Sequence, residues 1–169
     1  MTLEEAIKTA IVYEIKIQRL YQEAHQMVSD PIGKHIFQDL ANDEQKHVVY
    51  LKDSLEQWQK TGQLSPEKLE TSLPAKEIIL QGVKKLSSRM AREDRNDEKQ
   101  MLSKALSVEI ETSNFYEQMV AEMPAQGRQM FARFLEIEAG HIAIVQAELD
   151  YISHTGYWFD FKEFDMEEP

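Results

Sequence analysis

The chain has 169 residues, a formal net charge of −11 and no cysteine. This length suits one compact domain with a substantial core. The negative charge argues against nucleic acid and anionic membranes as partners, and the lack of cysteine excludes disulfides, iron–sulfur clusters and a cysteine-ligated iron centre within the chain. No apolar run is long enough to span a membrane, and the first ten residues already follow a helical pattern. We therefore expect a cytoplasmic protein without a signal peptide.

Four long amphipathic helices are predicted where apolar residues recur at alternating steps of three and four, at about 2–28, 31–60, 97–123 and 126–153. Ser29-Asp30-Pro31 stops the first helix and caps the second, and a tight turn is expected at 124–127. Residues 61–96 contain Pro66 and Pro74 and one short helical pattern near 78–86. They predict a long connection between two helical hairpins.

The order of short, long and short connections predicts an all-α, ferritin-like four-helix bundle, in which a long crossover joins two antiparallel hairpins. We expect a single domain over 1–169, with hairpins at 1–60 and 97–154, the crossover at 61–96 and an aromatic, acidic tail at 155–169. The tail contains Tyr157, Trp158, Phe159, Phe161 and Phe164. Such aromatics should pack across the bundle or against a second copy, which predicts a homodimer. A docking surface for a redox partner is the alternative.

Each predicted helix carries a glutamate at mid-length in its apolar stripe, and two of these glutamates are followed one turn later by a histidine. The six residues are Glu14, Glu44, His47, Glu109, Glu138 and His141. Four carboxylates in a dry core are severely destabilising unless their charge is offset, and two divalent cations would supply about +4 against about −4. The sequence therefore predicts a dinuclear site. Mixed carboxylate and imidazole donors suit iron or manganese and tolerate zinc.

The two halves of the chain repeat these donors. Glu14 and Glu109 are 95 residues apart, whereas each Glu-x-x-His pair recurs after 94 residues. This predicts a pseudo-twofold arrangement in which Glu14 and His47 serve one metal, Glu109 and His141 serve the other, and the remaining two glutamates bridge. Which carboxylates bridge stays open at this point. The alternative is that these residues form ordinary buried salt bridges in the core. It is disfavoured because the same apolar stripes contain no lysine or arginine to pair with the four glutamates.

With these motifs the chain resembles the rubrerythrin-like branch of the ferritin-like superfamily over about residues 2–154. The resemblance implies a non-haem diiron centre that reacts with O₂ or peroxide, held by the six residues named above. Two features depart from the family. The chain has no rubredoxin-like domain, and Thr112 stands where rubrerythrins place an additional glutamate.

Three functions follow as hypotheses. The first is a diiron oxidoreductase that reduces hydrogen peroxide, or O₂, in oxidative-stress defence and is re-reduced by an external donor such as a rubredoxin or a reductase. The second is a ferroxidase or iron-handling protein. The third is a metal-stabilised helical binding protein without turnover. The sequence does not choose the metal, the oxidant or the donor.

Three further residues lie near the predicted site. Tyr21 and Tyr116 follow Glu14 and Glu109 by seven residues on the same stripes. We expect them to hydrogen-bond a ligand or to donate electrons, with plain packing as the alternative. Asp43 directly precedes Glu44 and is rotated away from the stripe, so we expect it to be solvated or to support the site from outside.

Overall fold

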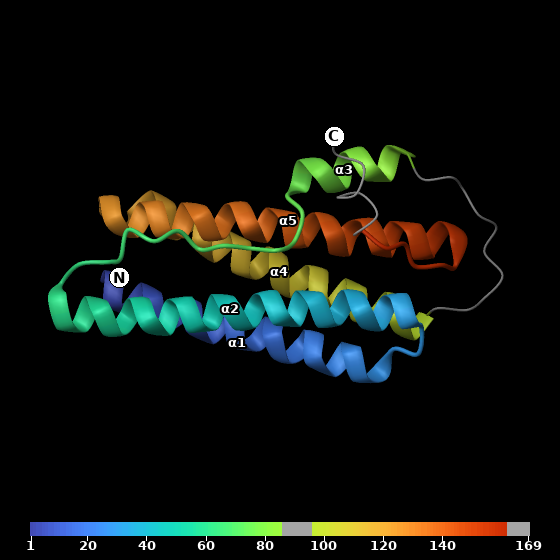
Figure 1. Ribbon diagram of the computed structural model, residues 1–169, viewed down its shortest axis with the longest axis horizontal. Coiled ribbons are helices and arrows are strands. Elements are labelled where there is room, and N and C mark those ends of the chain that lie inside the picture. Colours follow the sequence, from blue (N-terminus) through green and yellow to red (C-terminus); the bar gives the residue numbers. More distant parts are fainter. Residues whose placement is uncertain (86–95, 162–169) are drawn as a thin grey trace.

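The computed structural model describes residues 1–85 and 96–161, and within them it contains five helices and no strand. The helices are α1 (Leu3–Met27), α2 (Pro31–Thr61), α3 (Lys76–Lys85), α4 (Asn96–Glu122) and α5 (Ala125–Thr155). Helices α1 and α2 form one hairpin and α4 and α5 the other, and the two hairpins lie against each other (Figure 1). The predicted all-helical bundle is confirmed. The last residue of the short helical pattern expected near 78–86 and Phe164 of the aromatic tail lie outside the described residues.

The helix ends follow local sequence signals. Thr2 and Glu5 form a capping box at the start of α1, and Asp30 caps α2 by accepting hydrogen bonds from Ile32 N at 2.8 Å and Gly33 N at 3.2 Å. Helices α2 and α5 end at glycines with positive φ, which is the usual C-terminal stop. The predicted tight turn is present but is shorter than the expected 124–127, because α4 ends at Glu122 and α5 already begins at Ala125 with Pro124 as its N-cap.

The apolar core is split into two clusters by a polar layer at mid-length. In α1, for example, Leu3 and Ile7 belong to one cluster and Ile17 belongs to the other, with Glu14 between them. The same sequence of apolar, polar and apolar positions recurs in α2 and α5. The polar layer therefore crosses the bundle at one level and is sealed by hydrophobic packing above and below.

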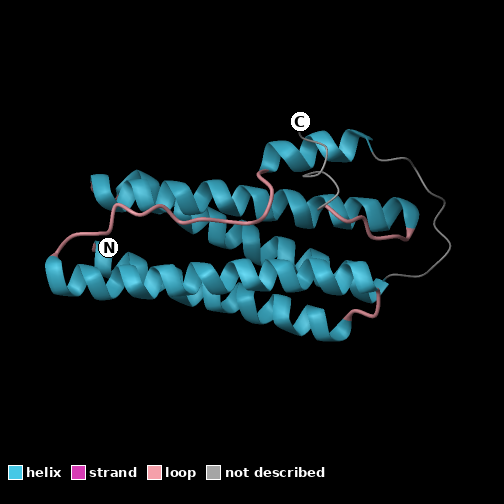
Figure 2. Cartoon of the chain, in the orientation of Figure 1, coloured by secondary structure: helices cyan, strands magenta, loops and turns pink. Residues whose placement is uncertain are grey.

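The connection over 62–75 runs along the bundle between α2 and α5 (Figures 1 and 2). The Tyr50 hydroxyl of α2 donates a hydrogen bond to the Glu67 carbonyl at 2.7 Å, and Arg133 Nε of α5 donates one to the Leu69 carbonyl at 2.9 Å. A Cβ on Gly140 of α5 would lie 3.0 Å from the Pro74 carbonyl oxygen, so glycine permits this close approach. The connection is thus fixed to both helices.

The described part of the tail packs back onto its own bundle. Its buried aromatics are Trp158, Phe159 and Phe161. The Trp158 ring meets Phe37 edge-on at 5.4 Å, and its Nε1 donates a hydrogen bond to Glu98 Oε2 at 2.9 Å. This is the first of the two expected arrangements, and a second copy stays a prediction. Among the described helices, none is both long and apolar enough to cross a membrane.

Candidate metal centre

All six predicted donors meet in the polar layer. Each is at most 1% exposed, and four different helices supply them. The donor atoms form two groups, and within each group they lie within 4.8 Å of one another. The first group consists of Glu14, Glu44, His47 and Glu138, and the second consists of Glu44, Glu109, Glu138 and His141. Glu44 and Glu138 therefore belong to both of these groups, while each of the other four residues belongs to one of them. A third group joins Asp43 to His47 and His141, and its donor atoms also lie within 4.8 Å of one another.

The histidines present the same ring nitrogen, Nδ1, to the glutamates. His47 Nδ1 lies 3.2 Å from Glu44 Oε2, 3.3 Å from Glu14 Oε2 and 3.4 Å from Glu138 Oε1. His141 Nδ1 lies 2.7 Å from Glu44 Oε1, 3.3 Å from Glu109 Oε1 and 3.5 Å from Glu138 Oε2. The two rings stack with centroids 5.3 Å apart and planes 7° apart. Both imidazoles thus face one cage of carboxylate oxygens.

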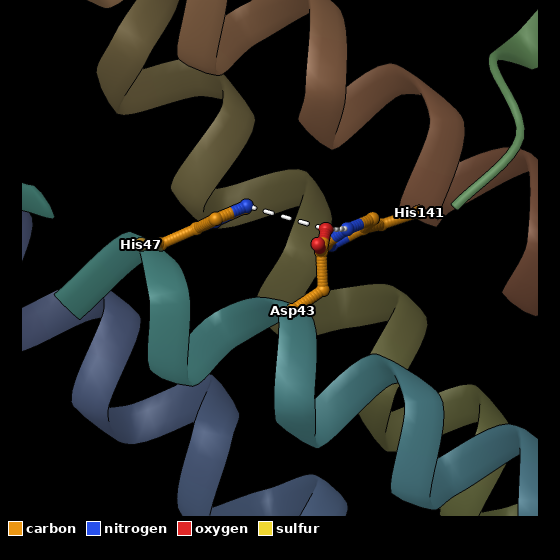
Figure 3. Close-up of side chains that lie close together, drawn as sticks. All are labelled: Asp43, His47 and His141. Carbon is orange, nitrogen blue, oxygen red and sulfur yellow. Dashed lines mark hydrogen bonds and ion pairs between the residues drawn. The ribbon is translucent and has the colours of Figure 1, made fainter. Parts of the chain in front are cut away.

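The opposite ring nitrogens, Nε2, converge on Asp43, which lies between the two histidines (Figure 3). His141 Nε2 is 2.7 Å and His47 Nε2 is 3.3 Å from the same oxygen, Asp43 Oδ2. The expectation of a solvated Asp43 is wrong because its side chain is 1% exposed, whereas its alternative role of supporting the site matches this geometry. An acceptor at Nε2 favours the tautomer that leaves Nδ1 free to bind a metal.

The two predicted tyrosines bond across the bundle. The Tyr21 hydroxyl of α1 donates a 2.5 Å hydrogen bond to Glu109 Oε1 of α4, and the Tyr116 hydroxyl of α4 donates one to Glu14 Oε1 of α1. Each half of the chain therefore holds the glutamate of the other half. These contacts match the expected hydrogen bonds to ligands, while electron donation by either tyrosine stays a prediction.

Without metal, the glutamates are unequal in charge. Burial and the negative charge of Glu14 raise the pKa of Glu44 to about 8. Burial alone would raise the pKa of Glu14 too, but a hydrogen bond from Glu44, together with His47 and Tyr116, lowers it to about 2. Burial and neighbouring Glu138 likewise raise the pKa of Glu109 well above its usual range. In each hairpin, one glutamate is thus held protonated beside another.

The histidines are charged in the same metal-free state. Burial lowers the pKa of His47, but the charges of Glu44 and Glu14 outweigh it and raise the pKa well above its usual value. His141 shows the same balance, with Glu44 and Glu138 as the outweighing charges. Protons on buried carboxyls and imidazoles therefore take the place that metal cations would occupy, and metal binding would release them.

The donor set fits divalent metal ions. Both carboxylate oxygens of Glu44 and both of Glu138 are buried, and in the described part of the chain they face the Nδ1 atoms of His47 and His141 without a well-aligned hydrogen bond. Buried polar atoms are rarely left in this state, and here all four face the centre of one cage. Carboxylate oxygens and imidazole nitrogens are donors for iron, manganese and zinc. The cluster can hold metal ions.

The shell around the cage is aromatic and adds no further carboxylate at the position of Thr112. That side chain is fully buried, but its hydroxyl donates to the Val108 carbonyl of its own helix at 2.8 Å. Neighbouring Glu111 points outward to Lys16, at 3.3 Å. Phe134 covers the His47 ring edge-on at 5.4 Å. Apolar side chains therefore separate the donors from bulk water.

Glu148 is a buried acid that was not predicted. Glu148 of α5 is fully buried, and its Oε1 accepts a hydrogen bond from Phe159 N of the tail at 3.0 Å. Burial raises its pKa well above the usual range, as do Asp160 and Asp30, against the backbone hydrogen bond from Phe159. A signal was present in the sequence, because Glu148 continues the stripe of Glu138 and His141 by two turns.

Comparison with known proteins does not assign the chain to a family. No protein-family model matches the chain, and no curated protein or solved structure matches it. The candidate site therefore stands on its own geometry.

Proposed function

We propose that the polar layer is a dinuclear metal centre and that the protein is a diiron oxidoreductase reducing hydrogen peroxide. The observation that carries this proposal is the double membership of Glu44 and Glu138, which alone belong to both of the groups that contain glutamates. In this proposal these two glutamates would be shared by two metals, while Glu14 and His47 would hold one metal and Glu109 and His141 would hold the other. The mixed carboxylate and imidazole donor set suits iron or manganese and tolerates zinc.

The ferritin-like class of four-helix bundle is part of the same proposal. Support comes from the two hairpins and from the connection that runs along the length of the bundle between them (Figure 1). In that class, two helices each supply one glutamate and the other two each supply Glu-x-x-His. Here α1 and α4 supply Glu14 and Glu109, and α2 and α5 supply the two Glu-x-x-His pairs.

A pair of ferrous ions would supply two electrons and Lewis acidity to the oxidant. The net reaction is H₂O₂ + 2 H⁺ + 2 e⁻ → 2 H₂O, and a separate protein or small-molecule donor returns the two electrons. Within the chain, the hydroxyl groups of Tyr21 and Tyr116 orient the two unshared glutamates, Glu109 and Glu14. Asp43 holds both imidazoles with Nδ1 toward the metals. The aromatic shell keeps bulk water from the reduced site.

The decisive experiment is anaerobic loading with Fe²⁺, followed by stopped-flow spectra after mixing with H₂O₂ or, separately, with O₂. Peroxide should oxidise two retained irons per chain, and it should do so faster than O₂. Iron content after desalting shows whether the irons stay bound. Glu111→Ala is the matched control, because Glu111 lies on α4 beside Glu109 but points to Lys16 at the surface.

Other outcomes contradict the proposal in distinct ways. Faster oxidation by O₂ with release of Fe³⁺ would assign the site to iron handling, with Fe²⁺ as substrate. Tight binding of Zn²⁺ without iron oxidation would leave a structural metal in a binding protein. Failure to bind any divalent metal would overturn the site itself.

A further inference from the structure

We infer that Thr71, in the connection between α2 and α3, is a positioning residue of the metal centre, acting through the single aspartate that orients both histidines. This inference rests on the proposed function, because it concerns how metal ligands are held. The contact that carries it is the hydrogen bond from Thr71 Oγ1 to Asp43 Oδ2, at 2.8 Å. A segment outside the four long helices thereby becomes part of the site.

The direction of this hydrogen bond is fixed by the turn that contains Thr71. Its hydroxyl oxygen accepts a hydrogen bond from the backbone N–H of Leu73 at 3.1 Å. Because that N–H supplies a proton to the oxygen, the hydroxyl proton remains free to point at Asp43. Thr71 is therefore a donor, and the carboxylate is the acceptor.

Asp43 depends on one oxygen for all of its contacts. Its Oδ2 accepts hydrogen bonds from Thr71 Oγ1 and His141 Nε2 and lies 3.3 Å from His47 Nε2. Its Oδ1 is buried and accepts no hydrogen bond from a described donor. Rotating the carboxylate would break every one of these contacts together. A third donor that approaches from the connection fixes the position of Oδ2 between the two rings. Thr71 thus determines the orientation of both imidazoles through one atom.

No equivalent acid in the second hairpin offers a substitute. The residue 94 positions after Asp43 is Ile137, which is 4% exposed and belongs to the apolar cluster at one end of the bundle. His141 therefore reaches across the bundle to the aspartate of the other hairpin. Loss of the Thr71 contact should disturb both metals and not only the one nearer α2.

The orientation also selects the ring nitrogen that binds. An acceptor at Nε2 keeps the proton there and presents Nδ1 to the cage. Without a fixed acceptor, each ring can exchange tautomers or rotate, and its Nδ1 no longer stays directed at the glutamates. Removing an acceptor that orients a ligating histidine typically weakens metal binding by about 10- to 100-fold. Removing only the donor behind it should weaken binding by about tenfold.

The test uses the full chain and Zn²⁺ alone as a diamagnetic probe, with affinity measured by competition against a chromogenic chelator. Three variants are compared with the natural protein. Thr71→Val removes the hydroxyl while keeping the shape, and Thr71→Ser restores the hydroxyl. Thr9→Val makes the same change in α1, where the Thr9 hydroxyl donates to the Glu5 carbonyl of its own helix at 2.9 Å.

We expect Thr71→Val to bind Zn²⁺ about tenfold more weakly, while Thr71→Ser and Thr9→Val stay within about twofold of the natural chain. Long-range ¹H–¹⁵N spectra of the histidine rings give a second readout, which a general loss of stability would not move. In the Zn²⁺-loaded natural chain they should show His47 and His141 protonated at Nε2 and not at Nδ1. In Thr71→Val these two resonances should broaden or shift while His35 and His154 stay unchanged.

The outcomes separate this inference from the proposed function. If the natural protein binds two Zn²⁺ tightly and Thr71→Val matches it in affinity and ring spectra, Thr71 has no positioning role although the metal centre stands. If Thr9→Val weakens binding equally, the loss is not specific to Thr71 and the inference is overturned. If the natural protein binds neither Zn²⁺ nor Fe²⁺, the proposed function and this inference both fall.

Discussion

The two hairpins of this protein supply the same donors but surround them differently. Glu14, Glu44 and His47 in the first hairpin match Glu109, Glu138 and His141 in the second, and the tyrosines bond reciprocally between them. Outside this set the symmetry fails in three places. Asp43 corresponds to Ile137, Ser54 to Glu148, and the tail packs beside Gly33 rather than beside its counterpart Gly127.

This difference indicates which features the site requires twice and which it requires once. In the proposed dinuclear centre two metals need two sets of donors, and the donors are duplicated. One carboxylate between two stacked imidazoles can serve both, so Asp43 has no counterpart. The single connection and the single tail each pack against one side of the bundle, and the residues that receive them differ between the hairpins accordingly. Variants made in matched pairs test each part of this comparison.

The largest effect is expected at the shared glutamates. Glu44→Ala with Glu138→Ala should abolish binding of two irons, since both residues belong to both of the donor groups that contain glutamates. Glu14→Ala and Glu109→Ala should instead each weaken one metal and do so to a similar extent. Metal content per chain after Fe²⁺ loading and desalting measures both effects. Retention of two tightly bound irons by the double variant would show that the site is assigned to the wrong residues.

The two tyrosine hydroxyls should contribute unequally to stability, although they make equivalent contacts. Tyr116 donates to Glu14, whose pKa is lowered to about 2, whereas Tyr21 donates to Glu109, whose pKa is raised. Hydrogen bonds to charged groups are the stronger ones, so Tyr116→Phe should cost the metal-free protein about 1.5–3 kcal/mol and Tyr21→Phe about 0.5–1.5 kcal/mol. Urea unfolding at pH 7 measures both, with Tyr13→Phe as the control. Equal costs would contradict the assigned charge difference.

The glycine pair tests the packing of the tail. A Cβ on Gly33 would lie 2.7 Å from Cε2 of the Trp158 ring, whereas one on Gly127 would meet the movable Cδ1 of Leu3 at 2.7 Å. Gly33→Ala should therefore lower the free energy of unfolding by about 1–3 kcal/mol, as overpacking does. Gly127→Ala should change it by less than about 1 kcal/mol, because helix propensity favours alanine. Similar thermal midpoints for both variants would argue against close packing of Trp158 in solution.

The smallest effect concerns pH and the unmatched Glu148. Its pKa is raised in the folded state above 4.5, so its contribution to stability is complete below that pH and is lost as pH rises through the folded pKa. Stability should fall by up to about 1.4 kcal/mol per pH unit in this window. Glu148→Gln keeps an acceptor for Phe159 N and should remove the contribution of Glu148 to this slope, leaving the contributions of Glu44 and Glu109. Unfolding measured from pH 5 to pH 9 checks it, and an unchanged slope would assign the dependence to other groups.

The donors were predictable and their supports were not, for a physical reason. Glu14 and Glu44 interrupt apolar stripes, and the spacing of a helix alone places such residues in the core. Asp43 lies about 100° around α2 from Glu44, so its burial depends on the connection that covers it. Nothing in the local pattern of 62–75 specifies that Thr71 returns to α2. The tail was also predictable only in part: its aromatic residues predicted burial, but not the surface of the bundle that buries them.

The reciprocal tyrosine bonds also bear on the order of folding. Each hairpin forms from neighbouring segments, whereas the bonds Tyr21–Glu109 and Tyr116–Glu14 join residues 88 and 102 positions apart. Contacts between distant residues are slow to form, so the hairpins should assemble before they dock. During synthesis, the last of the six donors to emerge is His141, near the end of the chain. The complete cage therefore arises only once both hairpins have been synthesised and have docked, and it is this late docking step that a metal ion would have to capture.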